Sequence, residues 1–117
     1  MANPVTHFEI IGADGAALQR FYGDLFGWKI DSNNAWQYGL VAAGGEGGIG
    51  GGIAADQGSD GHRVTVYAQV DDPQKYLDKA VELGATVVMP VTEMGEGMPV
   101  IAMFTDPAGN VTGLLKG

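Results

Sequence analysis

No cysteine occurs among the 117 residues, so disulfide bonds, thiolate zinc sites and a cysteine nucleophile are all excluded. Basic residues are also scarce: six lysines and arginines stand against 14 acidic residues, and the formal net charge is −8. This balance disfavours attraction to nucleic acid and to anionic membranes, and we expect neither as a partner. No apolar run is long enough to span a bilayer, and the N-terminal residues do not resemble a secretory signal. The default expectation is a soluble cytoplasmic protein.

Two segments of the chain share one layout. In residues 7–27 and again in residues 65–84, a short alternating run ends at an aspartate, a helical pattern follows, and a glycine closes it. The second segment follows the first by about half the chain length, which indicates two copies of one unit. An apolar content of 45% is enough for one core. We therefore predict a single domain over residues 1–117, with modules at about 4–57 and 62–117.

Hydrophobic periodicity predicts a β-α-β-β-β order in each module. In the first module we expect a helix from the N-cap Asp14 to Gly27, and strands at 5–11, 28–31, 36–43 and 49–55. In the second we expect a helix from Asp72 to Gly84, and strands at 63–70, 85–91, 98–106 and 111–116. Residues 56–62, which are polar and contain glycine, are the predicted linker. The strand at 49–55 is dense in glycine, so it needs tertiary support or close approach by another backbone.

Alternation assigns the strand residues to faces. The apolar residues of strand 63–70 are expected to pack on the helices, and a buried stripe is expected on the second helix. These positions are Val64, Val66, Ala68 and Val70 on the strand, and Tyr76, Leu77, Ala80, Val81 and Leu83 on the helix. The opposite faces carry His7, Glu9 and Ile11 in one module and Thr65, Tyr67 and Gln69 in the other. We predict that these polar faces line a cleft; the alternative is that they meet water on an open sheet or at a dimer surface.

Three phrases of the sequence resemble the vicinal oxygen chelate superfamily, which includes glyoxalase I, extradiol dioxygenases and bleomycin-resistance proteins. They are HFEIIGADGAALQRFYGDLFGW, VDDPQKYLDKAVELGATVV and MFTDPAGNVTGL, and the resemblance covers nearly the whole chain. It implies an α+β fold in which paired βαβββ modules form a curled mixed sheet around a cleft. In the enzymatic branches it also implies a divalent metal held by His and Glu side chains.

The metal-ligand positions of the superfamily map onto this sequence one by one. The histidine of the first strand matches His7, whereas its counterpart in the second module falls on Thr65 and the glutamate after the DPxGN turn falls on Gly113. The remaining ligand falls near Ala55, with Asp56 as the nearby carboxylate. A stable catalytic metal site generally has three protein ligands. We therefore predict no cofactor. The alternative is a divalent metal held by His7 with Glu9 and Asp56.

The candidate ligand-binding residues each have a structural alternative. Tyr67 offers a hydroxyl in the predicted cleft, and Trp36 and Tyr38, on one strand face, could form an aromatic wall or pack in the core. Met103 belongs to a group of methionines that suits an adaptable pocket or a core. The full candidate set is His7, Glu9, Trp36, Tyr38, Thr65, Tyr67, Gln69 and Met103. His62 is expected to be a solvated loop residue.

Three functions remain open on this sequence. The first is metal-independent binding of a small, partly aromatic or apolar molecule in the cleft, as in sequestering resistance proteins. The second is a glyoxalase- or dioxygenase-like enzyme with an atypical metal site, or a metal-free enzyme that uses His7 and Glu9 for proton transfer. The third is an interaction domain without a ligand. Thr65 and Gly113, which stand at metal-ligand positions of the superfamily and are not metal-binding residues, favour the first function. A homodimer is also expected, because glycine-rich strands at the sheet edges would benefit from being covered.

Overall fold

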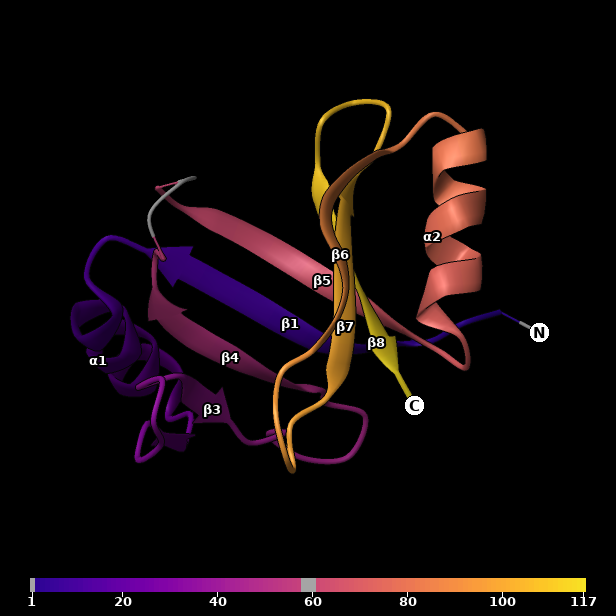
Figure 1. The fold of residues 1–117 in the computed structure, drawn as a ribbon. Coiled ribbons are helices and arrows are strands. Elements are labelled where there is room, and N and C mark those ends of the chain that lie inside the picture. The colour runs from indigo at the N-terminus through magenta and orange to yellow at the C-terminus, as the bar shows by residue number, and fades with distance from the viewer. Residues whose placement is uncertain (1, 58–60) are drawn as a thin grey trace. The chain divides into compact units, whose positions relative to one another are not determined.

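The computed structural model describes residues 2–57 and 61–117, which form an α+β fold with an eight-stranded mixed sheet and two helices (Figure 1). The elements are β1 (Val5–Gly12), α1 (Gly15–Phe26), β2 (Ile30–Asp31), β3 (Gly39–Val41), β4 (Gly50–Ala55), β5 (Arg63–Val70), α2 (Pro73–Glu82), β6 (Thr86–Glu93), β7 (Val100–Thr105) and β8 (Val111–Lys116). The predicted β-α-β-β-β order, found twice, is confirmed. Part of the predicted linker, residues 58–60, lies outside the described residues. Neither described helix has the length and apolar character of a membrane span.

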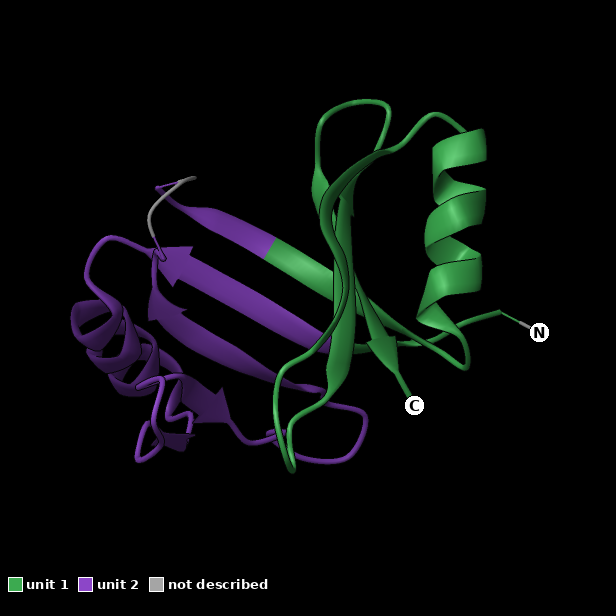
Figure 2. Cartoon of the chain, in the orientation of Figure 1, with its two compact units in different colours: residues 1–6, 65–117 green, residues 7–64 purple. Residues whose placement is uncertain are grey.

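The chain divides into two compact units, drawn in different colours in Figure 2. Unit 1 contains Met1–Thr6 and Thr65–Gly117, and unit 2 contains His7–Val64. Two strands are therefore divided, because β1 begins in unit 1 and β5 begins in unit 2. The predicted cleft between the polar faces of the two modules stays a prediction.

In unit 2 the strands follow the order β2-β3-β4-β1, with β4 parallel to β1 and antiparallel to β3. Helix α1 packs on β4. Its N-cap is Asp14, whose Oδ1 accepts a hydrogen bond from the Ala17 N–H at 3.0 Å, and Gly27 ends it in the left-handed conformation at φ 70°. Both predicted caps of α1 are confirmed. At Gly15 an added Cβ would lie only 2.5 Å from the backbone nitrogen of Ala55, so glycine permits this close approach.

In unit 1 the order is β5-β8-β7-β6, and α2 packs on β6, β7 and β8. Asp72 caps α2 by accepting a hydrogen bond from the Lys75 N–H at 3.3 Å, and Pro73 occupies the first helical position, as predicted. The core of the unit comprises Val70, Leu77, Ala102 and Leu114.

Several apolar positions expected to be buried are exposed. Because α2 covers β6, β7 and β8, only the end of β5 reaches its core, and Val64 and Val66 are 72% and 44% exposed instead of packed on a helix. On α2 the predicted stripe is buried at Leu77 but exposed at Val81, and Leu83 forms the exposed C-cap. On α1, the apolar side chains of Phe21, Leu25 and Phe26 are likewise exposed.

The first module differs from the prediction in two further places. The strand expected at 36–43 is only β3, because Gln37 adopts a positive φ of 52° and breaks the extended backbone before it. Trp36 and Tyr38 therefore share no strand face, and Trp36 is exposed rather than in the core. The glycine-rich strand β4 lies between β3 and β1, not at a sheet edge, so the two neighbouring backbones support it.

Candidate functional site

A polar cluster lies on the face of β1 that carries His7 and Glu9, within unit 2. The parallel register places Glu9 beside Gly52 of β4, so both positions belong to the same face. The ring of Tyr38 occupies the space where a Cβ on Gly52 would stand. Glycine at this position of β4 therefore leaves room for the Tyr38 ring, whose hydroxyl contacts His7 and Glu9 of β1.

The turn before β3 positions Tyr38. Asn34 Oδ1 accepts hydrogen bonds from the backbone N–H groups of Tyr38 at 3.0 Å and of Trp36 at 3.2 Å. The Asn34 amide also donates to the Tyr38 carbonyl oxygen at 2.8 Å. With three bonds to one side chain, the turn has a fixed shape, and the Tyr38 ring leaves it in a fixed direction.

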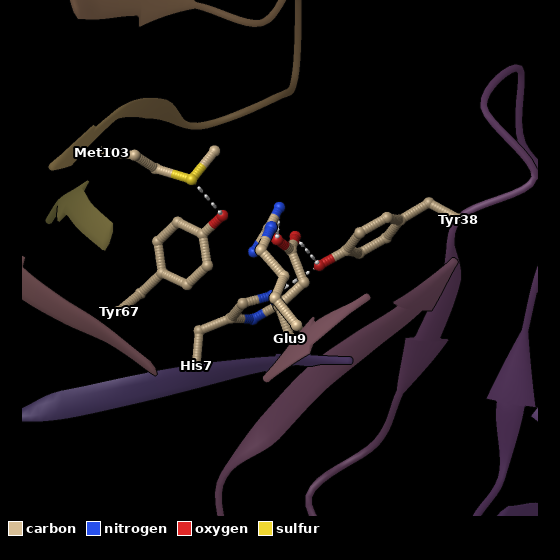
Figure 3. A network of polar contacts seen from close by, with 6 residues as sticks. His7, Glu9, Tyr38, Tyr67 and Met103 are labelled. Carbon is tan, nitrogen blue, oxygen red and sulfur yellow. Dashed lines mark hydrogen bonds and ion pairs between the residues drawn. The ribbon is translucent and has the colours of Figure 1, made fainter. Parts of the chain in front are cut away.

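Four side chains of unit 2 form a continuous chain of polar contacts (Figure 3). The Tyr38 hydroxyl donates to Glu9 Oε2 at 2.8 Å and also lies 2.9 Å from His7 Nε2. Arg63, at the start of β5, pairs with the other carboxylate oxygen of Glu9 at 2.6 Å. The Glu9 and Arg63 side chains are only 9% and 16% exposed, so solvent screens this ion pair weakly. The rings of His7 and Tyr38 are nearly parallel, with 6.3 Å between centroids.

The cluster affects His7 in two opposing ways. Burial lowers the pKa of His7 below its ordinary value of 6.5, because an imidazolium loses hydration inside the protein. The negative charge of Glu9 raises it, but by less than burial lowers it. The net direction is downward, so the neutral imidazole is the favoured form at neutral pH.

Unit 1 brings together other predicted residues. Thr65 and Tyr67 are buried on β5, and the Tyr67 hydroxyl lies 3.8 Å from the sulfur of Met103 on β7 (Figure 3). The Tyr67 ring covers Gly113 of β8, its partner in the parallel β5–β8 register, and fills the space of a Cβ there. Gln69 is half-buried further along β5.

Comparison with known proteins places the chain in a family. The profile of the glyoxalase-like domain matches residues 8–115. The chain belongs to this family, within the vicinal oxygen chelate superfamily. A protein named as a glyoxylase, CFP32, from Mycobacterium tuberculosis and Mycobacterium bovis is 30% identical over 112 residues, which cover 86% of this chain and 41% of that protein. The chain thus spans less than half the length of this relative.

Solved structures of other proteins share the fold. A methylmalonyl-CoA epimerase from Streptomyces coelicolor, in complex with 2-nitronate-propionyl-CoA, is 15% identical with a TM-score of 0.65, over 100% of this chain and 99% of that one. A glyoxalase/bleomycin resistance protein/dioxygenase superfamily member from Vibrio splendidus is 14% identical with a TM-score of 0.66, over 99% and 100%. At these identities the likeness extends to the fold.

The glyoxalase-like domain of this chain fits a divalent metal poorly at the superfamily's ligand positions. Beside His7, the carboxylate of Glu9 is in contact with the guanidinium of Arg63, whose positive charge opposes a second cation. At Gly113 a glutamate side chain would have to displace the ring of Tyr67. Asp56, directly after β4, accepts a hydrogen bond from the Gly61 N–H at 3.1 Å. In the described ranges, no three His, Asp or Glu side chains gather closely enough to form a metal site.

The remaining candidates lie apart from the cluster. His62 is exposed in the loop before β5, and Trp36 is exposed in the Asn34 turn. An open groove of about 530 Å³ lies on unit 2 along the other face of β1, where Phe8, Ile10 and Trp28 contribute to its walls. Because successive strand residues alternate in direction, this apolar groove is separate from the face of His7 and Glu9.

Sequence reasoning missed three residues that build the cluster. For Arg63, nothing in the sequence pairs its positive charge with Glu9. Asn34 gave no signal beyond a predicted turn. Gly52 belongs to a run that predicted close packing, but the identity of the ring that approaches it depends on the register of β1, β3 and β4.

Proposed function

We propose that this glyoxalase-like domain binds a small, partly aromatic or apolar molecule without a metal, at the His7 and Tyr38 cluster of unit 2. The observation that carries this proposal is the double engagement of Glu9, by Arg63 at 2.6 Å and by the Tyr38 hydroxyl at 2.8 Å. A carboxylate held in this way organises the hydrogen bonds of its neighbours. It is poorly suited to hold a cation or to act as a proton-transfer base.

Two features of the cluster support an aromatic or apolar ligand. The rings of His7 and Tyr38 provide flat surfaces, and both side chains are partly accessible rather than fully buried. A neutral imidazole and a tyrosine hydroxyl add hydrogen bonds that orient a ligand without adding charge. The Arg63 and Glu9 charges compensate each other, which also favours a ligand with little net charge.

Isothermal titration with 2-naphthol as the probe, on protein treated with a chelator, tests the proposal. We expect saturable binding that added Ni²⁺, Zn²⁺, Mn²⁺ or Fe²⁺ leaves unchanged. Tyr38→Phe should weaken binding by about tenfold, as expected for loss of a hydrogen bond worth about 1.4 kcal/mol. Val64→Thr is the matched control, because Val64 is exposed and belongs to the walls of the apolar groove.

Two results would contradict this function. One is stoichiometric retention of a metal that disappears in His7→Ala, which would identify a metal site. The other is probe binding that Val64→Thr abolishes and Tyr38→Phe does not affect, which would transfer the site to the apolar groove.

A further inference from the structure

The apolar groove on β1 has the size and the walls of a ligand site. Its volume of about 530 Å³ lies within the range of about 300–1,000 Å³ that is usual for small-molecule pockets. Phe8 and Ile10 of β1 contribute to its walls, together with Trp28 and Ile49. All of its lining residues belong to unit 2, so the groove is a feature of that unit alone.

Trp28 is an aromatic side chain of the groove that packing holds in place. Its ring is nearly parallel to that of Tyr22, with 5.6 Å between centroids, and it is tilted against Phe26 at 5.1 Å and Phe8 at 5.4 Å. The indole is therefore in contact with rings of both α1 and β1. Aromatic rings attract cations as well as apolar groups, and tryptophan does so most strongly.

A glycine-rich turn places one acidic side chain at the groove. The Gly48 N–H donates to the Gly45 carbonyl oxygen at 3.0 Å, and Glu46 stands between Gly45 and Gly47, whose φ values are 144° and 83°. Of the described residues that line the groove, Glu46 alone has an ionisable side chain. Within residues 2–57 and 61–117, no ion pair engages it.

The charges near the groove favour a cation over an anion. Lys29 follows Trp28 and Arg63 precedes Val64, but neither is among the lining residues, and Arg63 is in contact with Glu9. A cationic ligand would be attracted both by the acidic side chain and by the aromatic walls. The net charge of −8 also opposes an anionic membrane or a second copy of this chain as the occupant.

We infer that the apolar groove is a second binding site, for an aromatic or apolar molecule that carries a positive charge. Ligands of this class are aromatic amines with a protonated nitrogen and quaternary ammonium compounds. Their apolar part lies against Phe8 and Trp28, and their cationic group lies near Glu46. This site is independent of the proposed function, because His7 and Tyr38 lie at the opposite face of β1.

An NMR titration with 1-naphthylmethylammonium tests the site and its place. We expect the indole N–H signal of Trp28 to shift to saturation, with Trp36, exposed in the Asn34 turn, as the internal control. The affinity should be at least about fivefold higher than for 1-naphthylmethanol, the neutral alcohol of similar shape. Added salt should weaken binding of the cation more than binding of the alcohol, because salt screens the attraction.

Substitutions that change charge test the role of the acidic side chain. Glu46→Gln should weaken binding of the cation by about twofold to fivefold, the loss expected for an exposed ion pair. The matched control is Glu96→Gln, because Glu96 also stands between two glycines with positive φ, Gly95 and Gly97, and does not line the groove. At the exposed Val64, Val64→Lys should weaken binding and Val64→Glu should strengthen it. A general disturbance of the strand cannot produce both effects.

Three results would overturn the inference. The first is equal affinity for the cation and the alcohol, or no shift of Trp28 with either. The second is binding of the cation that Tyr38→Phe weakens and Glu46→Gln does not, which would assign this ligand to the cluster. The third is a Trp28 signal that changes with protein concentration in the absence of the probe, which would show a second copy on the groove. Failure of 2-naphthol to bind contradicts the proposed function alone.

Discussion

The Glu9–Arg63 ion pair is the residue-scale feature on which the other contacts of the cluster depend. Both side chains are largely removed from solvent, and removing one charge leaves the other without its partner. We expect Glu9→Gln to lower the free energy of unfolding by about 3–5 kcal/mol. Urea denaturation measures this change.

The double variant Glu9→Gln/Arg63→Met distinguishes an uncompensated charge from loss of packing. If the charge is responsible, the double variant should be more stable than Glu9→Gln alone, because no buried charge remains. Equal stability of the two variants would show that the packing of the Glu9 side chain accounts for the loss.

His7 gives unit 2 a pH dependence of known sign. Because burial lowers its pKa below 6.5, the unfolded chain takes up a proton at His7 before the folded protein does. The stability contributed by the neutral imidazole is therefore present above about pH 6.5 and is lost as the pH falls below it. Urea denaturation from about pH 7.5 to about pH 5.5 should show a decline that is smaller in His7→Gln. Identical pH profiles for the two proteins would contradict the lowered pKa.

Gly52 offers a test of the register that builds the cluster. An added methyl group at this position overlaps the Tyr38 ring, so Gly52→Ala should displace Tyr38 and weaken its contacts with His7 and Glu9. We expect loss of 2-naphthol binding and a changed His7 signal in NMR spectra. The control is Gly44→Ala, where the added group meets no atom within 4 Å. Equal effects of the two substitutions would count against the placement of the ring.

At the scale of the elements, the helices depend on their N-caps. Asp14 and Asp72 each accept a hydrogen bond from the third residue that follows. Replacing either with Ala should lower the free energy of unfolding by about 1 kcal/mol, a typical loss for this cap. Asp24→Ala, at an exposed position inside α1, is the control. Equal losses at the control position would mean that the effect comes from general charge rather than from capping.

The bounds of some helices and strands could be predicted from the sequence, and those of others could not. Caps are local, so Asp14, Gly27 and Asp72 could be identified from neighbouring residues alone, and β8 was predicted with its observed bounds because a tight turn precedes it. The strand expected at 36–43 was too long, because Gln37 adopts a positive φ. The Asn34 side chain stabilises this turn, and the hydrophobic periodicity of the sequence contains no sign of it.

The candidate site could be predicted only in part for a similar reason. The shared face of His7 and Glu9 follows from alternation along one strand, which the sequence contains. Their contacts with Tyr38 and Arg63 follow from which strands pair and in which register, and these are properties of the folded sheet. Whether the candidate residues bind a ligand stays a prediction.

For the whole molecule, the homodimer stays a prediction, but the reason given for it does not hold for β4. The glycine-rich strand was expected at an edge that a partner would cover, but β4 lies between two other strands. Size-exclusion chromatography with light scattering at micromolar concentration should give twice the mass of the chain. A mass of 12.1 kDa would identify a monomer and contradict the prediction.

Because β1 and β5 are each divided between the two units, the chain cannot be cut once into two fragments that correspond to the units. The chain reads as a tandem repeat, yet the first residues of β1 group with unit 1, where the Pro4 carbonyl accepts a hydrogen bond from the Gln69 N–H at 2.8 Å. A cut in the loop before β5 therefore yields two fragments, neither of which encodes a whole unit. Each half carries a short piece that is grouped with the unit of the other half, so a split at this point separates both units from residues that belong to them.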